Sequence, residues 1–282
     1  MQFTASDIHL SRPEDQKFCT DQLAKLENKG LFTPPSRAGS VVYPGSLGGA
    51  NWGSAALDPA TSVLYTRISN LPYLVREEYV GPRGPGKINH LERIIIKRLP
   101  EWAGGMPLPL RSTMGTPDSG SEQRDQSPQT GTPYLLSRQA LTTPSGVPCG
   151  PAPFGAIVAI NLDSGTKLWS VPHGKMVPNE PGSIGDGGVM VTAGGVLFGA
   201  STNDAFLRAY DSATGQELWH TPLPVPSQAT PMSYAVKGRQ YVVISAGGHG
   251  FIGKGQNDAV IAYALPTNGA QGRRPQGSPP GR

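Results

Sequence analysis

The feature that most constrains this fold is a repeat with a period of 50 residues. The segment AIVAINLDSGTKLW at 156–169 returns as AFLRAYDSATGQELW at 205–219. The matched positions, always 50 apart, are Ala159 with Ala209, Asn161 with Asp211, Ser164-Gly165 with Thr214-Gly215, and Trp169 with Trp219. A period of this size is typical of stacked arrays such as the blades of a β-propeller.

Each copy of the repeat predicts two strands joined by a tight turn. The Asn or Asp turns the chain with its own side chain, and the glycine supplies the backbone angle. One copy leaves a face uncovered, so its neighbours must supply the cover, and the tryptophan packs across that boundary. We therefore expect residues 156–266 to form consecutive four-stranded antiparallel blades, with Trp169 and Trp219 largely buried in equivalent positions.

Two other segments keep part of the repeat. LDPATSVLY at 57–65 has the aspartate and the turn, but it lacks the glycine and ends in Tyr65. NDAVIAYAL at 257–265 resembles NDAFLRAYD at 203–211, but the turn and the tryptophan are absent. Apolar runs such as YVVISAG fit strands that neighbouring blades cover on both faces.

Composition agrees with many short strands and tight turns. Of 282 residues, 37 are glycine and 29 are proline, while only 16% are charged. The net charge is +4, but the tail at 267–282 carries three arginines and no acid, so no nucleic-acid patch is indicated on the body. We interpret residues 267–282 as a disordered tail and residues 1–266 as one partial propeller.

One helix and one insertion interrupt the β pattern. SRPEDQKFCTDQLAKLENKG at 11–30 predicts a helix with Ser11 as candidate N-cap, Pro13 in the first turn and Gly30 at the end. Its apolar face carries Phe18, Leu23 and Leu26. Residues 76–130 are polar and rich in proline and glycine, which predicts a loop-rich insertion.

The cysteines and the apolar segments limit the class of protein. Cys19 and Cys149 fit neither a disulfide-rich scaffold nor a closely spaced metal site; one bridge in an oxidising compartment is an open alternative. No apolar run reaches the length needed to span a bilayer, and the first residues show no signal-peptide pattern.

The motif A-x-[DN]-x-x-[ST]-G-x-x-x-W, present twice, resembles the tryptophan-docking motif of quinoprotein alcohol and sugar dehydrogenases. The pieces GLFTPPS, YPGSLGGANWG, TAGGVLFGASTNDAFLRAYDSATGQELW, QATPMSY, GRQYVVISAGGHG and AYALP follow in the same order. This set resembles the C-terminal part of the membrane-bound glucose dehydrogenase branch, which also includes quinate and polyol dehydrogenases. It covers roughly residues 10–75 and 130–266.

The resemblance implies an all-β fold: a partial eight-bladed-type quinoprotein β-propeller with about half of the blades, one short N-terminal helix and a polar loop insertion. It also implies the C-terminal portion of a dehydrogenase that uses pyrroloquinoline quinone (PQQ) and calcium or magnesium to oxidise a sugar or polyol hydroxyl. In this family electrons pass to ubiquinone, and the enzyme is periplasmic and anchored in the inner membrane. No residues here are identified as metal ligands.

The chain departs from the family in what it lacks. The family's general-base aspartate and quinone-binding lysine have no counterpart at matching positions. We therefore expect the chain to be incomplete alone, and a separate polypeptide carrying the missing N-terminal blades is a candidate partner.

Three candidate site residues come from the glycine loop and the second repeat. Asn51, in GGANWG, matches a family asparagine that points its amide at the quinone oxygens; the alternative is an Asn in a glycine turn. Trp52 is either a wall of the cofactor pocket or a blade-packing tryptophan. Asp204 is a catalytic candidate that orients His249 or a cationic group, or else caps a tight turn, as its counterpart Asp258 suggests.

The fourth candidate is His249 in AGGHG, with both a catalytic and a cofactor-binding role. Glycines on either side let a flat ring or a sugar approach, and the imidazole can donate to a quinone oxygen or a sugar hydroxyl. The alternative is a turn with a solvent-facing histidine. We expect Asn51, Asp204 and His249 to open onto the same end of the propeller. The remaining histidines are interpreted as ordinary surface residues: His9, His90, His173 and His220.

A second function remains open. A non-catalytic propeller, serving as a scaffold or in outer-membrane protein assembly, shares the docking motif because it needs blade packing only. It does not need GGANWG or AGGHG, so these two segments favour quinoprotein ancestry.

Overall fold

In the computed structural model, the described residues form mostly antiparallel β-structure and one α-helix, which confirms the expected fold class. The structure describes residues 3–79, 81, 125–129, 132–248 and 255–265. The chain divides into two compact units. Unit 1 comprises residues 1–51, 67–157 and 170–186, and unit 2 comprises residues 52–66, 158–169 and 187–282.

The helix of unit 1 follows a short 3₁₀ turn, η1 (Ala5–Asp7). Helix α1 (Pro13–Leu23) begins with Pro13 as expected, but its N-cap is Arg12 rather than Ser11, whose backbone N–H donates instead to Glu180 at 2.6 Å. The helix ends at Leu23, so the prediction that Gly30 closes it was wrong. Beyond Leu23 the chain turns, and Glu27 pairs with Ser40 instead of continuing the helix.

The core of unit 1 lies under helix α1. Cys19 and Leu23, one turn apart, are buried, and Phe18 and Leu26 pack against them, as the apolar face predicted. Cys19 is joined to Cys149 by a disulfide that spans 130 residues of sequence. The remaining buried members of this core are Phe3, Ile8, Val41 and Leu141.

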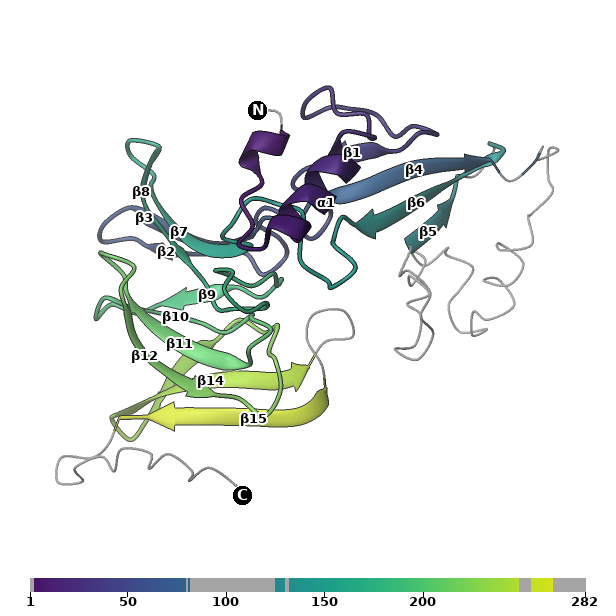
Figure 1. The fold of residues 1–282 in the computed structure, drawn as a ribbon. Coiled ribbons are helices and arrows are strands. Elements are labelled where there is room, and N and C mark those ends of the chain that lie inside the picture. Colours follow the sequence, from purple (N-terminus) through teal and green to yellow (C-terminus); the bar gives the residue numbers. More distant parts are fainter. Residues whose placement is uncertain (1–2, 80, 82–124, 130–131, 249–254, 266–282) are drawn as a thin grey trace, which may run out of the picture. The chain divides into compact units, whose positions relative to one another are not determined.

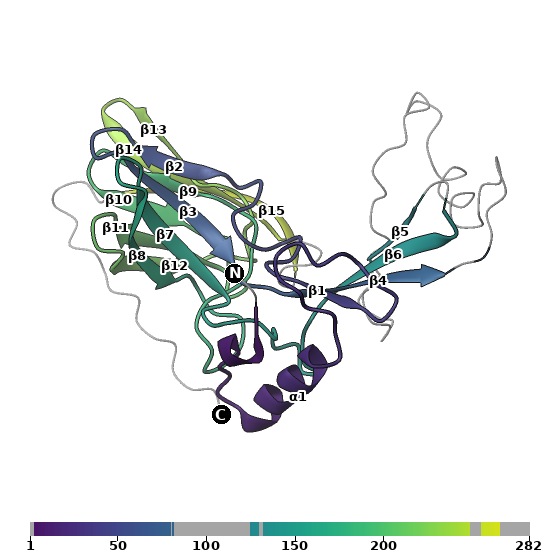
Figure 2. The same ribbon diagram turned by 90° about the horizontal axis from the view of Figure 1, so that it is seen from above.

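The sheet of unit 1 has the order β1-β4-β6-β5 and is antiparallel throughout (Figures 1 and 2). Its strands are β1 (Ser40–Val42), β4 (Tyr73–Tyr79), β5 (Asp125–Pro128) and β6 (Tyr134–Ala140). Two of them, β4 and β5, extend into the ends of the segment interpreted as a loop-rich insertion. Residues 82–124 and the expected disordered tail lie outside the described residues.

A second sheet joins segments that are far apart in sequence. Its order is β2-β3-β7-β8, formed by β2 (Ala55–Asp58), β3 (Val63–Ser69), β7 (Gly155–Asn161) and β8 (Thr166–Pro172). Strands β2 and β3 come from the partial copy LDPATSVLY, and β7 and β8 from the first full copy. The partial copy therefore supplies the two strands that the first repeat needs to complete a four-stranded sheet.

Two more sheets lie in unit 2. The sheet β9-β10-β11-β12 contains β9 (Val189–Val191), β10 (Val196–Gly199), β11 (Phe206–Asp211) and β12 (Glu217–Pro222). The last sheet contains β13 (Met232–Val236), β14 (Arg239–Gly248) and β15 (Gln256–Ala264). It has three strands among the described residues, so the expectation of four in every blade was wrong for this one.

The last two sheets share a small apolar core. Leu207 of β11 and Ile244 of β14 are buried in it, and Tyr263 of β15 packs against it. Its other buried members are Ala200, Leu223 and Ala246. This packing is what the repeat predicts, because each sheet covers a face that its neighbour leaves open.

The turns of the two full repeats are alike in detail. The backbone N–H of Ser164 donates to Asn161 Oδ1 at 2.8 Å, and that of Thr214 donates to Asp211 Oδ1 at 2.8 Å. The glycine that follows each has a positive φ, +67° at Gly165 and +75° in the second copy. The predicted turn mechanism is confirmed.

The partial copy forms the same turn without a glycine. The backbone N–H of Ala60 donates to Asp58 Oδ1 at 3.0 Å. Ser62 stands where the full copies have glycine and adopts φ +54°. A residue with a Cβ is strained in this region, so the turn forms in spite of the missing glycine.

The two tryptophans differ in cover. The indole N–H of Trp169 donates to the carbonyl of Ser212, in the turn of the next repeat, at 3.1 Å, and its ring lies 5.9 Å from that of Tyr65. Trp219 meets the edge of Tyr263 at 5.8 Å and remains 42% exposed. The expectation that both are largely buried was wrong for Trp219, because the third copy has no turn to cover it.

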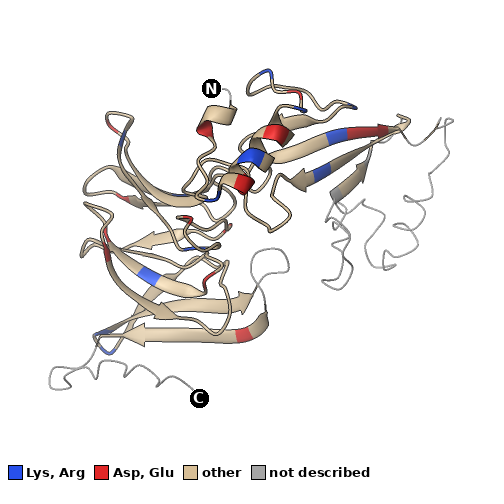
Figure 3. Ribbon diagram, in the orientation of Figure 1, with Lys and Arg blue, Asp and Glu red and all other residues tan. Residues whose placement is uncertain are grey.

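Acidic and basic residues are interspersed along the described ribbon, with no long run of one sign (Figure 3).

Candidate functional site

The loop that carries Asn51 is anchored in unit 1. Gly49 and Ser69 exchange backbone hydrogen bonds of 2.9 and 3.1 Å, and Gly49 has φ +64°, where glycine is favoured. The Asn51 amide nitrogen donates to Ser46 O at 3.3 Å and to Asp186 Oδ1 at 3.5 Å. The nitrogen end of the side chain therefore faces two acceptors of its own chain.

A buried arginine lies beside this loop. Arg67 is 4% exposed, and its Nη1 donates to Ser69 Oγ at 2.9 Å and to Gly185 O, while its Nη2 donates to Ser183 O. Burial lowers the pKa of Arg67 to about 9, and the charge of Asp186 acts in the opposite direction. Arg67 is thus a cation at neutral pH inside the core of unit 1.

Sequence reasoning missed both Arg67 and Asp186. Each carried a signal: Arg67 interrupts the strand sequence VLYTRIS, and Asp186 is the single acid in the glycine-rich segment GSIGDGG. A charge in a buried strand is uncommon unless it is paired.

Trp52 belongs to unit 2, and its side chain is 66% exposed. Packing of Trp52 in a sheet core is not seen among the described residues, so the structure gives no support to the blade-packing alternative. Its role as a wall of a cofactor pocket stays a prediction.

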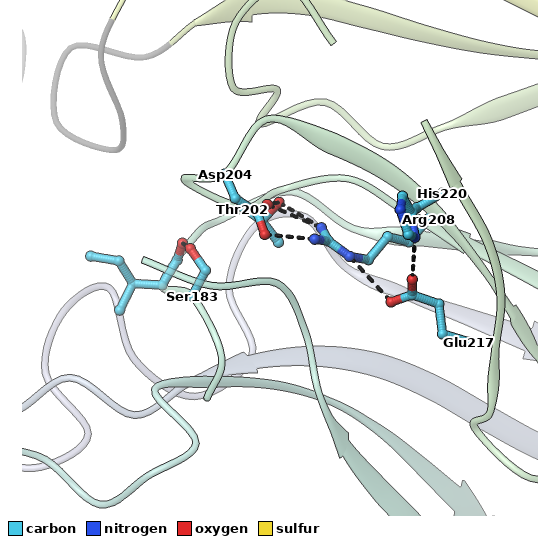
Figure 4. Close-up of polar contacts among 7 residues, drawn as sticks. Ser183, Thr202, Asp204, Arg208, Glu217 and His220 are labelled. Atoms are coloured by element: carbon cyan, nitrogen blue, oxygen red, sulfur yellow. Dashed lines mark hydrogen bonds and ion pairs between the residues drawn. The ribbon is translucent and has the colours of Figure 1, made fainter. Parts of the chain in front are cut away.

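Asp204 in unit 2 binds a cationic group. Arg208 Nη2 donates to Asp204 Oδ2 at 2.6 Å and Nη1 donates to Oδ1 at 3.1 Å, while the Thr202 hydroxyl donates to Oδ1 at 2.6 Å (Figure 4). Of the alternatives from sequence, this supports the one in which Asp204 orients a cation. Asp258 is exposed and has Ala262 where the second repeat has Arg208, so the two aspartates are not equivalent.

The charges continue across the sheet. Arg208 Nε lies 3.3 Å from Glu217 Oε2, and Glu217 Oε1 lies 2.6 Å from Nδ1 of His220 (Figure 4). Burial alone lowers the pKa of Arg208, but the hydrogen bond and charge of Asp204, together with the charges of Tyr210 and Glu217, outweigh it, so the pKa is raised. The Asp204 carboxylate binds Arg208 through both of its oxygens. It is therefore suited to orienting a cation rather than to removing a proton.

His249 lies outside the described residues, so its proposed convergence with Asn51 and Asp204 stays a prediction. The residues that flank it come close together: a Cβ on Gly248 would lie 2.0 Å from the carbonyl oxygen of Gly255. Gly248 also has φ +74°. Both observations explain why this segment is rich in glycine.

The other histidines differ from expectation at one position. His173 is fully buried in unit 1, so its interpretation as a surface residue was wrong. Its backbone N–H donates to Gly155 O and its carbonyl accepts from Ser183, which draws it inside. His9 and His220 are exposed as expected, and His90 lies outside the described residues.

A hollow of about 610 Å³ lies in unit 1, lined by residues of the N-terminal segment with Ala152, Glu180 and Pro181. None of the described candidate residues lines it. Within the described ranges, no group of three or more His, Cys, Asp and Glu is placed to hold a metal ion.

Comparison with known proteins places these features in context. Residues 1–242 match the family model for the β-propeller domain of PQQ glucose/ethanol/alcohol dehydrogenases. The quinoprotein glucose dehydrogenase of Escherichia coli (strain K12) is 36% identical over 265 residues, covering 90% of this chain and 30% of that protein. The quinate/shikimate dehydrogenase (quinone) of Acinetobacter baylyi is 34% identical over 279 residues, covering 92% of this chain and 30% of that protein.

Among solved structures, the quinohemoprotein alcohol dehydrogenase of Comamonas testosteroni matches with a TM-score of 0.47 and 23% identity, over 83% of this chain and 28% of that one. The chain therefore spans about a third of the length of the relatives it matches.

Proposed function

We propose, from the premise that the chain belongs to the PQQ glucose/ethanol/alcohol dehydrogenase β-propeller family, that it forms the C-terminal part of a dehydrogenase oxidising a sugar or polyol hydroxyl and passing electrons to a quinone. The observation that carries this proposal is the match over residues 1–242, which includes the Asn51 loop as well as both tryptophan repeats. A scaffold needs only the repeats, so the glycine loop favours the enzyme.

The residues present fit one part of a PQQ site. The Asn51 amide stands on an anchored loop, and the next residue in the sequence, Trp52, has an exposed ring. An amide can bind a carbonyl or carboxylate of the cofactor, and an indole can stack on a fused ring. When bound, PQQ supplies the redox chemistry by accepting the two electrons taken from the alcohol.

In this proposal Asn51 orients the ligand, and Asp204 holds Arg208 so that its guanidinium keeps one direction. From the family resemblance alone, His249 is assigned to contact the cofactor or the substrate hydroxyl. We assign no described residue to accept the proton of the alcohol, because the family's general-base aspartate has no counterpart at a matching position. We include a calcium or magnesium ion without assigning ligands, because the described residues offer no cluster for one.

We propose a periplasmic location, with ubiquinone as electron acceptor. The buried disulfide between Cys19 and Cys149 supports an oxidising compartment, because such bonds are rare where glutathione keeps thiols reduced. No helix in the described ranges has the length and apolar character needed to cross a membrane.

The test is dye reduction with glucose, quinate and other polyols, with PQQ and calcium or magnesium. The chain is assayed alone and after addition of the upstream two thirds of the Escherichia coli relative as a separate polypeptide. We expect little turnover alone, since a general base contributes about 10²–10⁴-fold, and restored turnover in the mixture. Turnover by the chain alone would contradict the proposal that the upstream part is needed for catalysis. If neither sample binds PQQ or turns over substrate, the non-catalytic scaffold is favoured.

A further inference from the structure

The hollow of unit 1 has a buried carboxylate in its wall. It measures about 610 Å³, a size suited to a small ligand, and Glu180 lines it although only 7% of this residue is exposed. An acidic side chain is rarely buried to this degree unless a cation or several hydrogen bonds replace the lost water.

Glu180 receives little such compensation from the described residues. Its Oε1 accepts one hydrogen bond, from the backbone N–H of Ser11 at 2.6 Å. Among the described residues no Lys, Arg or His forms an ion pair with Glu180, and no donor reaches its Oε2. An ionised carboxylate has about four acceptor positions, so Glu180 keeps acceptor capacity for a ligand.

Both walls of the hollow are held in place by hydrogen bonds. The carbonyl of Pro181, next to Glu180, accepts from the Phe154 N–H at 3.0 Å. On the opposite wall the Gln16 side chain donates to Ile8 O at 2.6 Å and accepts from the Leu10 N–H at 2.9 Å. Little further ordering is therefore needed when a ligand enters.

The charges around the hollow favour a cation. The first turn of α1, which borders it, adds the carboxylates of Glu14 and Asp15 to that of Glu180. Against these three stand the guanidinium of Arg12 and about half a positive charge from the helix dipole. The negative charges prevail while His9, which also lines the hollow, is neutral.

The rest of the lining selects among cations. Leu10, Pro13, Ala152 and Pro181 are apolar. Calcium and magnesium bind through several oxygen ligands, and the described residues offer no cluster of three or more acidic, His or Cys side chains. An aliphatic chain that ends in an ammonium group matches both parts of the wall, because its methylenes contact apolar residues and its N–H groups need acceptors.

We propose that this hollow is a binding site for a primary alkylammonium group, which donates to Oε2 of Glu180. The group belongs either to a free amine or to a lysine of another protein, since the chemistry is the same. The site is independent of the proposed dehydrogenase function, because none of the described candidate residues for that function lines the hollow.

The first experiment titrates the full, ¹⁵N-labelled chain with n-butylammonium chloride and follows the backbone amide of Ser11 by NMR. We expect a saturable shift, because a second donor on the Glu180 carboxylate changes the hydrogen bond that Ser11 makes to it. The controls are 1-butanol, which has the same chain without the charge, and sodium chloride at equal ionic strength. No saturable shift with butylammonium, or equal affinity for 1-butanol, would overturn the proposal.

A pair of variants locates the charge that matters. Glu180→Gln should weaken butylammonium binding at least tenfold, because a buried charged acceptor is lost. Glu14→Gln removes an exposed carboxylate from the same end of the helix and should weaken it less than about twofold. Equal losses in both variants, or full binding in Glu180→Gln, would overturn the proposal. If Glu180→Gln does not fold, the comparison of butylammonium with 1-butanol on the unaltered chain still decides.

The source of the ammonium group is tested with the peptide Gly-Lys-Gly, blocked at both ends. Binding at least tenfold tighter than that of butylammonium would support a lysine of another protein as the occupant. Equal or weaker binding of the peptide would support a free amine. Failure of both ligands to bind the unaltered chain would overturn the site itself.

Discussion

The two full repeats have the same turn and the same tryptophan, yet Trp169 docks onto the next repeat and Trp219 is 42% exposed. The first is met by Ser212 in a turn that the second repeat supplies. The second reaches only the edge of Tyr263 on strand β15. The shape of a turn is thus encoded within one copy, whereas the burial of its tryptophan is encoded in the copy that follows.

The largest effect should come from removing the tryptophans. We expect Trp169→Ala to lower the free energy of unfolding by about 2–3 kcal/mol and Trp219→Ala by about 1 kcal/mol, because only the first fills a packed site with a hydrogen bond. Urea denaturation measures both. Leu168→Ala and Leu218→Ala, at exposed neighbouring positions, are the controls. Equal losses of stability in the two tryptophan variants would contradict the claim that only Trp169 fills a packed site.

The second effect concerns the turn glycines. Gly215 is buried and lies in the turn that Trp169 contacts, while Gly165 is exposed with open space where a Cβ would stand. We expect Gly165→Ala to cost about 1 kcal/mol, from its positive φ alone, and Gly215→Ala about 2 kcal/mol. Thermal unfolding of the two variants measures both costs. A larger cost at Gly165 than at Gly215 would contradict the docking of Trp169 on the turn of the second repeat.

A smaller effect, of opposite sign, is expected at the partial copy. Ser62 adopts φ +54° where the full repeats have glycine. Ser62→Gly should raise the free energy of unfolding by about 0.5 kcal/mol, since relief of strain exceeds the added entropy of the unfolded chain. Ala60→Gly in the same turn is the control and should lower it. A loss of stability in Ser62→Gly would mean that the turn is not strained.

The smallest effect distinguishes the two turns by pH. Hydrogen bonds from the side chain and then the backbone of Thr214 lower the pKa of Asp211 below its ordinary value of 3.8, whereas Asn161 does not titrate. A lowered folded-state pKa means that the stabilisation is present above pH about 4 and is lost as the pH falls further. Unfolding followed from pH 7 to pH 2 should show less acid sensitivity in Asp211→Asn. Asn161→Asp should become more sensitive to acid. Unchanged stability profiles in both variants would refute the effect of the Thr214 hydrogen bonds on Asp211.

What could be predicted from sequence follows the same division between contacts within one short segment and contacts between distant segments. The turns at Asn161 and Asp211 were predictable because their hydrogen bonds lie within a few residues. The end of helix α1 was not, because the segment after Leu23 pairs, through Glu27, with a strand that is distant in sequence. The pairing of Asp204 with Arg208 required only that a nearby cation be considered.

The buried couple of Arg67 and Asp186 was beyond reach for a different reason. Arg67 lies on β3, whereas Asp186 follows a loop more than 100 residues later whose carbonyls, at Ser183 and Gly185, accept from Arg67; only the fold brings the two segments together. His173 is a similar case, since nothing in its immediate neighbours marks it as buried.

The disulfide of unit 1 also has a mechanical consequence. Because Cys19 and Cys149 are covalently joined, a force applied to the two ends of the chain cannot reach the residues between them. Those residues correspond to about 450 Å of extended chain, which stays out of the pulling path until the bond is reduced. The oxidised protein thus behaves under load as a shortened tether carrying a closed ring, and the ring holds the whole sheet β1-β4-β6-β5.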